Sequence, residues 1–179
     1  TPVPAATATP FPTPVATPAP KTRAVNGKQS ITVVTAEEPI GVASHGVGGG
    51  IMQFGHYDTM TDPLTWQSGD DLRIVPTSAT VGWEQLALDK WRFHLRRGVK
   101  FHNGEPWNAQ AALPSLAILS SSLSQSVSYQ YTGSFTSEAV DAYTVDITCA
   151  TPCPIFPNTA MYVNFTAPKF LATTTVETQ

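Results

Sequence analysis

Residues 91–107 read WRFHLRRGVKFHNGEPW and bring basic, histidine and aromatic side chains together in one short stretch. Lysine and arginine bind phosphate, and aromatic rings stack on bases, so the stretch is a candidate nucleic-acid patch. Its two histidines, His94 and His102, are also possible metal ligands. The alternative is an ordinary strand followed by a turn.

The order of the side chains favours the strand. Successive residues of a strand point to opposite faces, so Trp91, Phe93 and Leu95 share one face and the basic residues share the other. Base stacking would need aromatic rings on the basic face, so we expect the apolar face in a core and the basic face in solvent. Half of the ten lysines and arginines lie in this stretch or directly before it: Lys90, Arg92, Arg96, Arg97 and Lys100.

The composition also argues against nucleic acid as a partner. The chain has 179 residues, a formal net charge of −3 and a pI near 5.7, whereas phosphate binding needs an excess of positive charge. Hydrophobic residues make up 41% of the chain and charged residues 13%, which is typical of a folded domain. No apolar run is long enough to cross a membrane.

The residues that could do chemistry do not form a recognisable catalytic or metal-binding motif. Zinc sites contain close ligand pairs such as HExxH or CxxC, and the four histidines are scattered. Glu37 and Glu38 are adjacent, so in a strand they face opposite ways and cannot act as a paired acid and base. We therefore expect no metal, no cofactor and no enzyme activity. Residues 164–166 (NFT) match a short glycosylation sequon.

The two cysteines, Cys149 and Cys153, lie four residues apart in CATPC. Such a pair after a strand can close a small disulfide in an oxidising compartment, and the alternative is a pair of buried thiols. The spacing excludes a CxxC redox motif. We expect the disulfide, because the N-terminal segment described next is typical of exported proteins.

Residues 1–30 differ in composition from the rest of the chain. The first twenty residues contain seven of the sixteen prolines and no charge, so this segment is predicted to be an extended, disordered linker. Linkers of this kind join exported domains to a surface anchor, and the alternative is low-complexity sequence without a specific role. Residues 31–179 form the predicted folded domain, which we expect to be truncated because the C-terminal residues resemble an interrupted sequence.

Alternating and turn-forming residues predict mixed α and β structure in this domain. We expect strands at 31–39, 78–85, 91–101 and 143–149, with a further strand near 137–140, and a glycine-bearing loop at 41–57. Residues 62–76 are polar and turn-rich. Asn108 is placed to cap a helix over 109–119, which Pro114 should shorten or bend. A turn of helix is expected within 156–170.

The residues GWEQ at 82–85, followed by WRFHLRRGVKFHNGEPWNAQ, resemble a long motif of the family 5 extracellular solute-binding proteins, the peptide- and nickel-binding subunits of ABC importers. Residues 57–60 (YDTM) and 140–145 (VDAYTV) resemble further elements of that family in the same order. The resemblance covers residues 31–170. It departs from the family at Gly82, where a serine is usual, and at 110–115, which puts the local helix in doubt.

The resemblance implies an α+β fold, the N-terminal part of a two-lobed type II periplasmic-binding-protein-like fold. Most of the chain would be the small mixed subdomain with antiparallel strands, and the second lobe would be missing. It also implies ligand-binding residues: His45, Gly46 and Val47, whose backbone can approach a peptide, and Tyr129 and Tyr131. The motif at 91–101 would be scaffold.

The function that the resemblance implies is capture of a peptide or similar solute outside the membrane and its delivery to an ABC permease. The protein would be an extracytoplasmic monomer in the periplasm or on the outer face of the membrane, lipid-anchored through the linker. The alternative is a ligand-sensing or adhesion module that keeps the fold without transport. Neighbouring permease and ATPase genes would distinguish the two.

Overall fold

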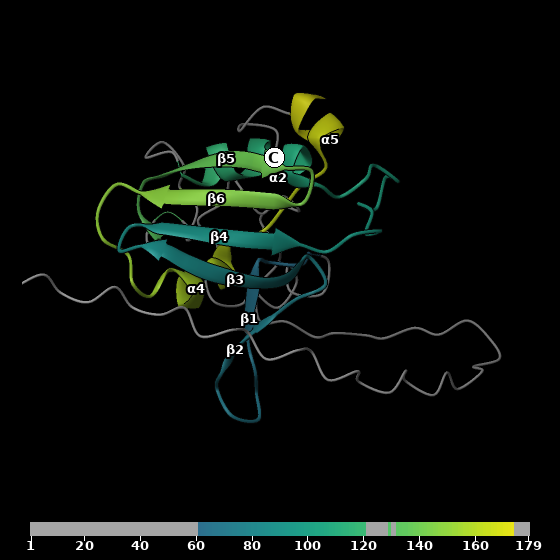
Figure 1. Cartoon of the computed structure of the whole chain (residues 1–179). Helices are drawn as coiled ribbons and strands as arrows, with labels where there is room; N and C mark the ends of the chain where they lie inside the picture. The colour runs from purple at the N-terminus through teal and green to yellow at the C-terminus, as the bar shows by residue number, and fades with distance from the viewer. Residues whose placement is uncertain (1–60, 121–128, 130–131, 174–179) are drawn as a thin grey trace, which may run out of the picture. The chain divides into compact units, whose positions relative to one another are not determined.

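The computed structural model describes residues 61–120, 129 and 132–173. The chain divides into two compact units, Thr1–Val34 and Thr35–Gln179, and all described residues belong to the second. Within them, a four-stranded antiparallel sheet is covered by helices, and a separate two-stranded sheet lies beside it (Figure 1). The predicted strand at 31–39 lies outside the described residues.

The sheet has the strand order β3-β4-β6-β5. It is built from β3 (Thr80–Ala87), β4 (Lys90–Leu95), β5 (Phe135–Asp141) and β6 (Thr144–Cys149). The predicted alternation in β4 is confirmed, because Trp91, Phe93 and Leu95 are 7%, 0% and 3% exposed. Apolar partners on β6 extend this face, since Phe93 pairs with Val145 and Trp91 with Ile147.

β6 differs from the half-buried strand that the sequence predicts. Thr144 and Asp146 lie on its polar face, yet both are buried. The physical reason is that β6 is an inner strand, so side chains of β4 and β5 cover that face from both sides. Asp146 is only 2% exposed.

Helix α2 (Ala109–Leu119) begins where the sequence predicts. Asn108 has an extended backbone, and its side-chain Oδ1 accepts a hydrogen bond from the Ala111 N–H at 2.9 Å. The helix runs on through Pro114 for eleven residues, so the proline does not shorten it. Ala112, Leu116 and Leu119 are buried on the side that faces the core.

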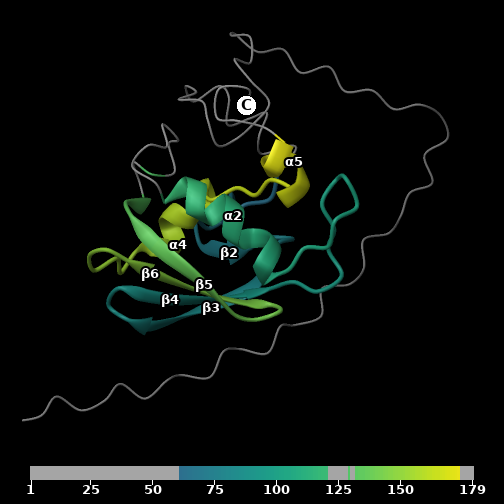
Figure 2. The same cartoon turned by 90° about the horizontal axis from the view of Figure 1, so that it is seen from above.

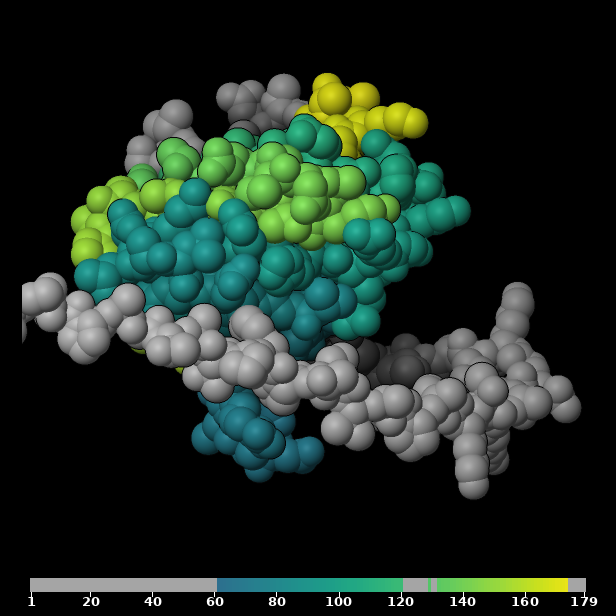
Figure 3. Space-filling view, viewed as in Figure 1, coloured from purple at the N-terminus to yellow at the C-terminus, as the bar shows by residue number. Residues whose placement is uncertain are grey.

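The helices form a layer on one face of the sheet. Figure 2 shows α2 and α4 (Phe156–Thr159) on the same side of the strands, and the core lies between the two layers. Phe156 fills this space, with its ring 6.0 Å from Phe93 and 5.7 Å from Phe135. In Figure 3 the other face of the sheet forms a continuous surface of β3, β4, β5 and β6.

A hairpin of β1 (Thr65–Gln67) and β2 (Ile74–Pro76) occupies the stretch that was predicted only to be polar and turn-rich. Its first residues are held by side-chain hydrogen bonds that the sequence pattern does not reveal. The Thr65 hydroxyl donates to the Pro157 carbonyl at 2.7 Å, and the Thr80 hydroxyl donates to the Leu64 carbonyl at 2.6 Å. These contacts with distant parts of the chain therefore hold β1 in its extended conformation.

The C-terminal described segment returns along the helical layer as α4, the 3-10 helix η1 (Ala160–Tyr162) and α5 (Pro168–Thr173). The predicted turn of helix is therefore present, in three short pieces. A disulfide joins Cys149, at the end of β6, to Cys153 before α4. The Cys153 carbonyl also accepts a hydrogen bond from the Trp91 indole at 2.9 Å, which fixes this loop against β4.

Candidate functional site

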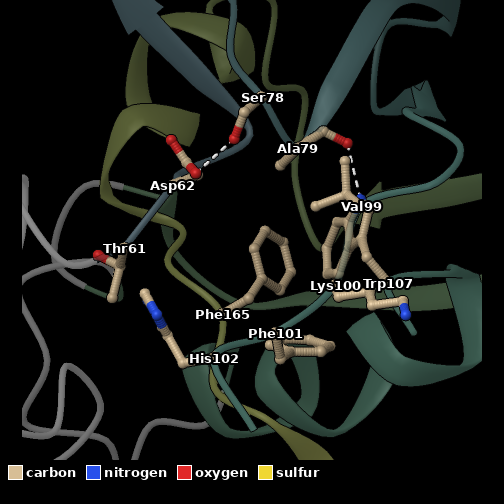
Figure 4. A pocket seen from close by; sticks show the side chains of 10 residues that line it. All are labelled: Thr61, Asp62, Ser78, Ala79, Val99, Lys100, Phe101, His102, Trp107 and Phe165. Atoms are coloured by element: carbon tan, nitrogen blue, oxygen red, sulfur yellow. Dashed lines mark hydrogen bonds between the residues drawn. The ribbon is translucent and has the colours of Figure 1, made fainter. Parts of the chain in front are cut away.

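A small hollow of about 80 Å³ lies beyond the end of β4 (Figure 4). Residues distant in the sequence meet there, because the chain passes it near residue 61, again at 78–79 and 99–107, and finally at 165. The lining residues are Thr61, Asp62, Ser78, Ala79, Val99, Lys100, Phe101, His102, Trp107 and Phe165.

A tight turn positions the residues on one side of this hollow. Gly98 and Gly104 have φ values of 77° and 87°, which a residue with a side chain rarely adopts. The turn is closed by backbone hydrogen bonds from the Phe101 N–H to the Glu105 carbonyl at 2.9 Å and from the Trp107 N–H to the Val99 carbonyl at 3.0 Å. The predicted Asn-Gly turn therefore presents Phe101 and His102 to the hollow.

Trp107 forms the aromatic base of the hollow. It is 3% exposed, and its indole N–H donates to the Ala79 carbonyl at 2.8 Å. Its ring centroid lies 4.6 Å from that of Phe165 and 5.6 Å from that of Phe101. These edge-to-face contacts make the base rigid. Polar groups lie at the rim, where the Ser78 hydroxyl donates to the Asp62 carboxylate.

A second, wider hollow of about 460 Å³ adjoins the first and shares Thr61, Phe101, His102 and Phe165 with it. Its remaining lining residues are Asn103, Thr166, Ala167, Lys169 and Phe170. Aromatic rings and a cation in a concave space can bind an apolar group that carries negative charge.

The outer face of the sheet carries a cluster of paired charges. Asp146 accepts two hydrogen bonds from Arg92, at 2.7 and 2.9 Å, and its carboxylate lies 3.0 Å from the Lys90 ammonium. The hydrogen bond from Arg92 lowers the pKa of Asp146 most, and Lys90 lowers it further. The predicted solvation of the basic face is therefore only partial for Arg92 and Lys90.

Of the predicted ligand-binding residues, only Tyr129 lies in the part of the chain that the structure describes. His45, Gly46, Val47 and Tyr131 lie outside the described residues. Tyr129 is half-buried, and its carbonyl accepts a hydrogen bond from the Gly133 N–H at 2.9 Å. Sequence reasoning treated 98–107 as turn and scaffold and missed the hollows, whose only local signal was the turn chemistry of FHNGEP.

Asn164 of the sequon has a structural position. It is 8% exposed, and its side-chain oxygen accepts a hydrogen bond from the Thr61 hydroxyl at 3.2 Å. A glycosylation acceptor lies on the surface, so this environment argues against modification of the folded protein.

The described part of the chain offers neither a metal cluster nor a membrane-spanning helix. Among these residues no cluster of three or more His, Cys, Asp or Glu side chains is arranged to hold a metal ion. None of the helices described here combines the length and the apolar character that a membrane span needs.

Comparison with known proteins identifies relatives of the same scaffold. The AppA oligopeptide-binding protein of Bacillus subtilis, solved with a nonapeptide, matches with a TM-score of 0.61 and 15% identity, covering 77% of this chain and 28% of that one. A nickel ABC transporter protein of Bacillus halodurans matches with a TM-score of 0.52 and 26% identity, covering 62% and 23%. The predicted α+β fold of a two-lobed binding protein is confirmed, as part of that fold.

A curated relative is more similar over a shorter stretch. The uncharacterized protein YhjP of Bacillus subtilis strain 168 is 60% identical over 52 residues, which is 29% of this chain and 9% of that protein. This chain therefore spans a small part of its relatives. The model of the bacterial extracellular solute-binding proteins, family 5 Middle, matches residues 73–178. The chain thus belongs to the family 5 bacterial extracellular solute-binding proteins.

Proposed function

We propose that this chain is part of the substrate-binding subunit of an ABC importer, which captures a peptide or a similar small solute and delivers it to a membrane permease. The family match over residues 73–178 is the observation that carries this proposal. The presence of the oligopeptide-binding AppA and a nickel ABC transporter protein among its structural neighbours supports the class of solute.

The described body acts as scaffold in this proposal. β4 turns its apolar side chains into the core, and Lys90 and Arg92 on its other face pair with Asp146, so we assign β4 to the framework. Recognition belongs to the loop with His45, Gly46 and Val47 and to Tyr129 and Tyr131. Residues 1–30 serve as the linker to a lipid anchor, and residues 31–179 begin the binding domain.

The test is thermal unfolding of the full-length protein to which this chain belongs, with oligopeptides, a nickel–histidine complex and oligosaccharides as probes. A solute that binds only the folded state at a hundred times its Kd adds about 2.7 kcal/mol to the free energy of unfolding. We expect one probe class to raise Tm by several degrees. If none of the three probe classes raises Tm, the transport proposal is wrong, and the sensing or adhesion alternative is favoured.

A pair of variants locates the solute. Replacing both Tyr129 and Tyr131 with alanine should reduce the solute-dependent rise in Tm. The matched control is Tyr143→Ala, because Tyr143 packs under Arg97 with 4.8 Å from the guanidinium carbon to the ring centroid. That control should lower Tm without changing the rise. If the solute raises Tm equally in the double variant and in the control, Tyr129 and Tyr131 do not contribute to solute binding.

A further inference from the structure

The turn at 101–107 contains an asparagine that is followed directly by a glycine. Asn103 and Gly104 are both exposed. Gly104 has a φ of 87°, and a Cβ built on it would meet no heavy atom of the described residues within 4 Å, its chain neighbours aside. Water therefore reaches the side chain of Asn103 and the backbone of Gly104, and the pair is accessible to reactions with solvent.

An asparagine before a glycine can lose its amide group by attack of the next backbone nitrogen. The Gly104 nitrogen gives up its proton and bonds to Cγ of Asn103, the bond from Cγ to Nδ2 breaks, and ammonia leaves with that proton. One water then opens the cyclic imide at either carbonyl and yields aspartate or isoaspartate. Glycine favours ring closure because it has no side chain to obstruct the ring.

The folded turn occupies both of the groups that must react. The Gly104 N–H donates to the Phe101 carbonyl at 2.9 Å. The Asn103 amide nitrogen donates to the Glu105 carboxylate, and Asn103 Oδ1 accepts a hydrogen bond from the Glu105 N–H at 3.1 Å. The imide ring can close only after these bonds break, so the reaction requires the turn to open.

Glu105 is itself held in place by contacts outside the asparagine–glycine pair. Its carbonyl accepts a hydrogen bond from the Phe101 N–H at 2.9 Å. Its carboxylate oxygen Oε2, which binds the Asn103 amide, also accepts a hydrogen bond from the Lys169 N–H at 3.3 Å. A fixed carboxylate restrains the Asn103 side chain more firmly than a freely rotating one, because less rotamer freedom is lost when the bond forms.

We propose that Asn103–Gly104 is a latent deamidation site, which the hydrogen bonds of the turn hold unreactive and which is modified when the turn opens. Opening of an exposed turn needs only local unfolding, so the sheet and the helices stay folded. The reaction is irreversible, so the modified fraction records how often the turn has opened. The proposal concerns this turn alone and does not depend on the proposed solute.

Modification keeps the turn open. Aspartate at position 103 has no amide donor, and its carboxylate lies beside that of Glu105, where like charges repel each other. Isoaspartate also adds a carbon atom to the main chain, within a turn that the hydrogen bond between Phe101 and Glu105 closes. Because Phe101 lines both hollows, either product should change their shape.

Peptide mapping of the full 179-residue chain by mass spectrometry follows deamidation during incubation at mildly alkaline pH. Asn103 should react at least roughly tenfold more slowly in the folded chain than in guanidinium chloride above the unfolding transition, because two hydrogen bonds must break and each is worth a factor of about five. Asn26–Gly27 has the same dipeptide sequence, so both sites should react at similar rates in the denaturant. Equal rates for Asn103 in the folded and denatured chains, or no reaction of Asn103 in denaturant where Asn26 reacts, would overturn the proposal.

Two variants test the part that Glu105 plays. Glu105→Ala removes the acceptor of the Asn103 amide and should accelerate deamidation of the folded chain by about fivefold. Glu105→Gln keeps an acceptor oxygen and should react more slowly than Glu105→Ala. Circular dichroism checks that both variants are folded in the assay. No acceleration in Glu105→Ala, or equal rates in the two variants, would overturn the proposal. If Glu105→Ala does not fold, the ratio between the folded and denatured natural chains decides.

Asn158 is the matched control for exposure. It is exposed like Asn103, but Thr159 follows it, and a β-branched side chain hinders ring closure. We expect no measurable deamidation of Asn158 in the time that Asn103 needs to react completely in the denaturant. Equal rates at the two positions there would mean that the glycine has no special role and would overturn the proposal.

Discussion

Asp146 organises the outer face of the sheet. Its carboxylate is 2% exposed and is held by Arg92 and Lys90, whose side chains keep 29% and 30% exposure. A buried carboxylate requires such partners, because its charge would otherwise be desolvated without compensation. Lys90 also reaches Glu138 on β5 at 3.2 Å, so the cluster ties three strands together.

Asp146→Asn should lower the free energy of unfolding by about 1 to 3 kcal/mol, because Arg92 and Lys90 lose a charged acceptor. Urea denaturation measures this change. Glu138→Gln is the control, since Glu138 is 68% exposed and its loss should cost less than about 0.5 kcal/mol. Equal effects of the two substitutions would show that the buried carboxylate has no special role.

The same residue predicts a dependence of stability on pH. The folded state lowers the pKa of Asp146, chiefly through the hydrogen bond from Arg92. A lowered pKa contributes stability above the unfolded value of about 3.9, and this contribution is lost as pH falls through the folded pKa. Between pH 6 and pH 3, the natural chain should therefore lose more stability than Asp146→Asn. Parallel pH profiles of Tm would refute this.

The start of α2 shows how one side chain positions an element. Asn108 satisfies the Ala111 N–H, and the Ala109 N–H donates to the Ala142 carbonyl at 2.9 Å in the turn between β5 and β6. The helix is thereby fixed at its first turn to the sheet that it covers. Its buried residues then belong to the same core as the apolar side chains of β4 and β6.

Asn108→Ala removes the cap and should reduce the free energy of unfolding by about 1 kcal/mol. Chemical denaturation followed by circular dichroism measures it. Gln110→Ala is a suitable control, because Gln110 is exposed on the same turn and its change should stay within about 0.5 kcal/mol. If the two variants unfold at the same urea concentration, the cap does not stabilise the helix.

The disulfide between Cys149 and Cys153 stabilises the connection between β6 and α4. Replacing Cys149 and Cys153 with serine opens a short loop and should lower the free energy of unfolding by about 2 kcal/mol. The natural chain in excess reductant should show a similar loss of Tm. No difference between oxidised and reduced protein would mean that the Trp91 hydrogen bond to Cys153 is sufficient to hold the loop.

For the whole molecule, stability is concentrated in the inner strands and the helical layer. Phe93, Ile147 and Val145 are 0%, 0% and 1% exposed, whereas the hairpin exposes Trp66 and Leu72. Backbone amides open at a free energy that rises with burial and with the number of contacts around them. The sheet and its helical layer are therefore expected to be more stable than the hairpin of β1 and β2.

Hydrogen exchange followed by mass spectrometry checks this distribution. Amides of β4 and β6 should exchange orders of magnitude more slowly than those of β1 and β2, because opening the inner strands requires global unfolding. Peptides from the outer strand β5 should lie between these extremes. Uniform protection would show that the hairpin unfolds together with the core.

The sequence by itself determined the local structure and the family. The faces of β4, the cap at Asn108 and the turn at 102–106 follow from spacing and turn chemistry, which depend on near neighbours. The long motif from Trp91 indicated the family because many residues match in a single order. These features depend mainly on residues that are close in the sequence, so they could be predicted without the tertiary structure.

Only the tertiary structure decided which polar residues are buried and where the surface is hollow. Asp146 is buried because its strand lies inside the sheet. The alternation of apolar and polar residues in one strand does not predict the order of the strands in the sheet. The hollows arise where residues near 61, 78, 100 and 165 meet, and Thr61 and Asn164 are 103 positions apart. Contacts across such distances depend on how the layers pack, which local periodicity does not determine.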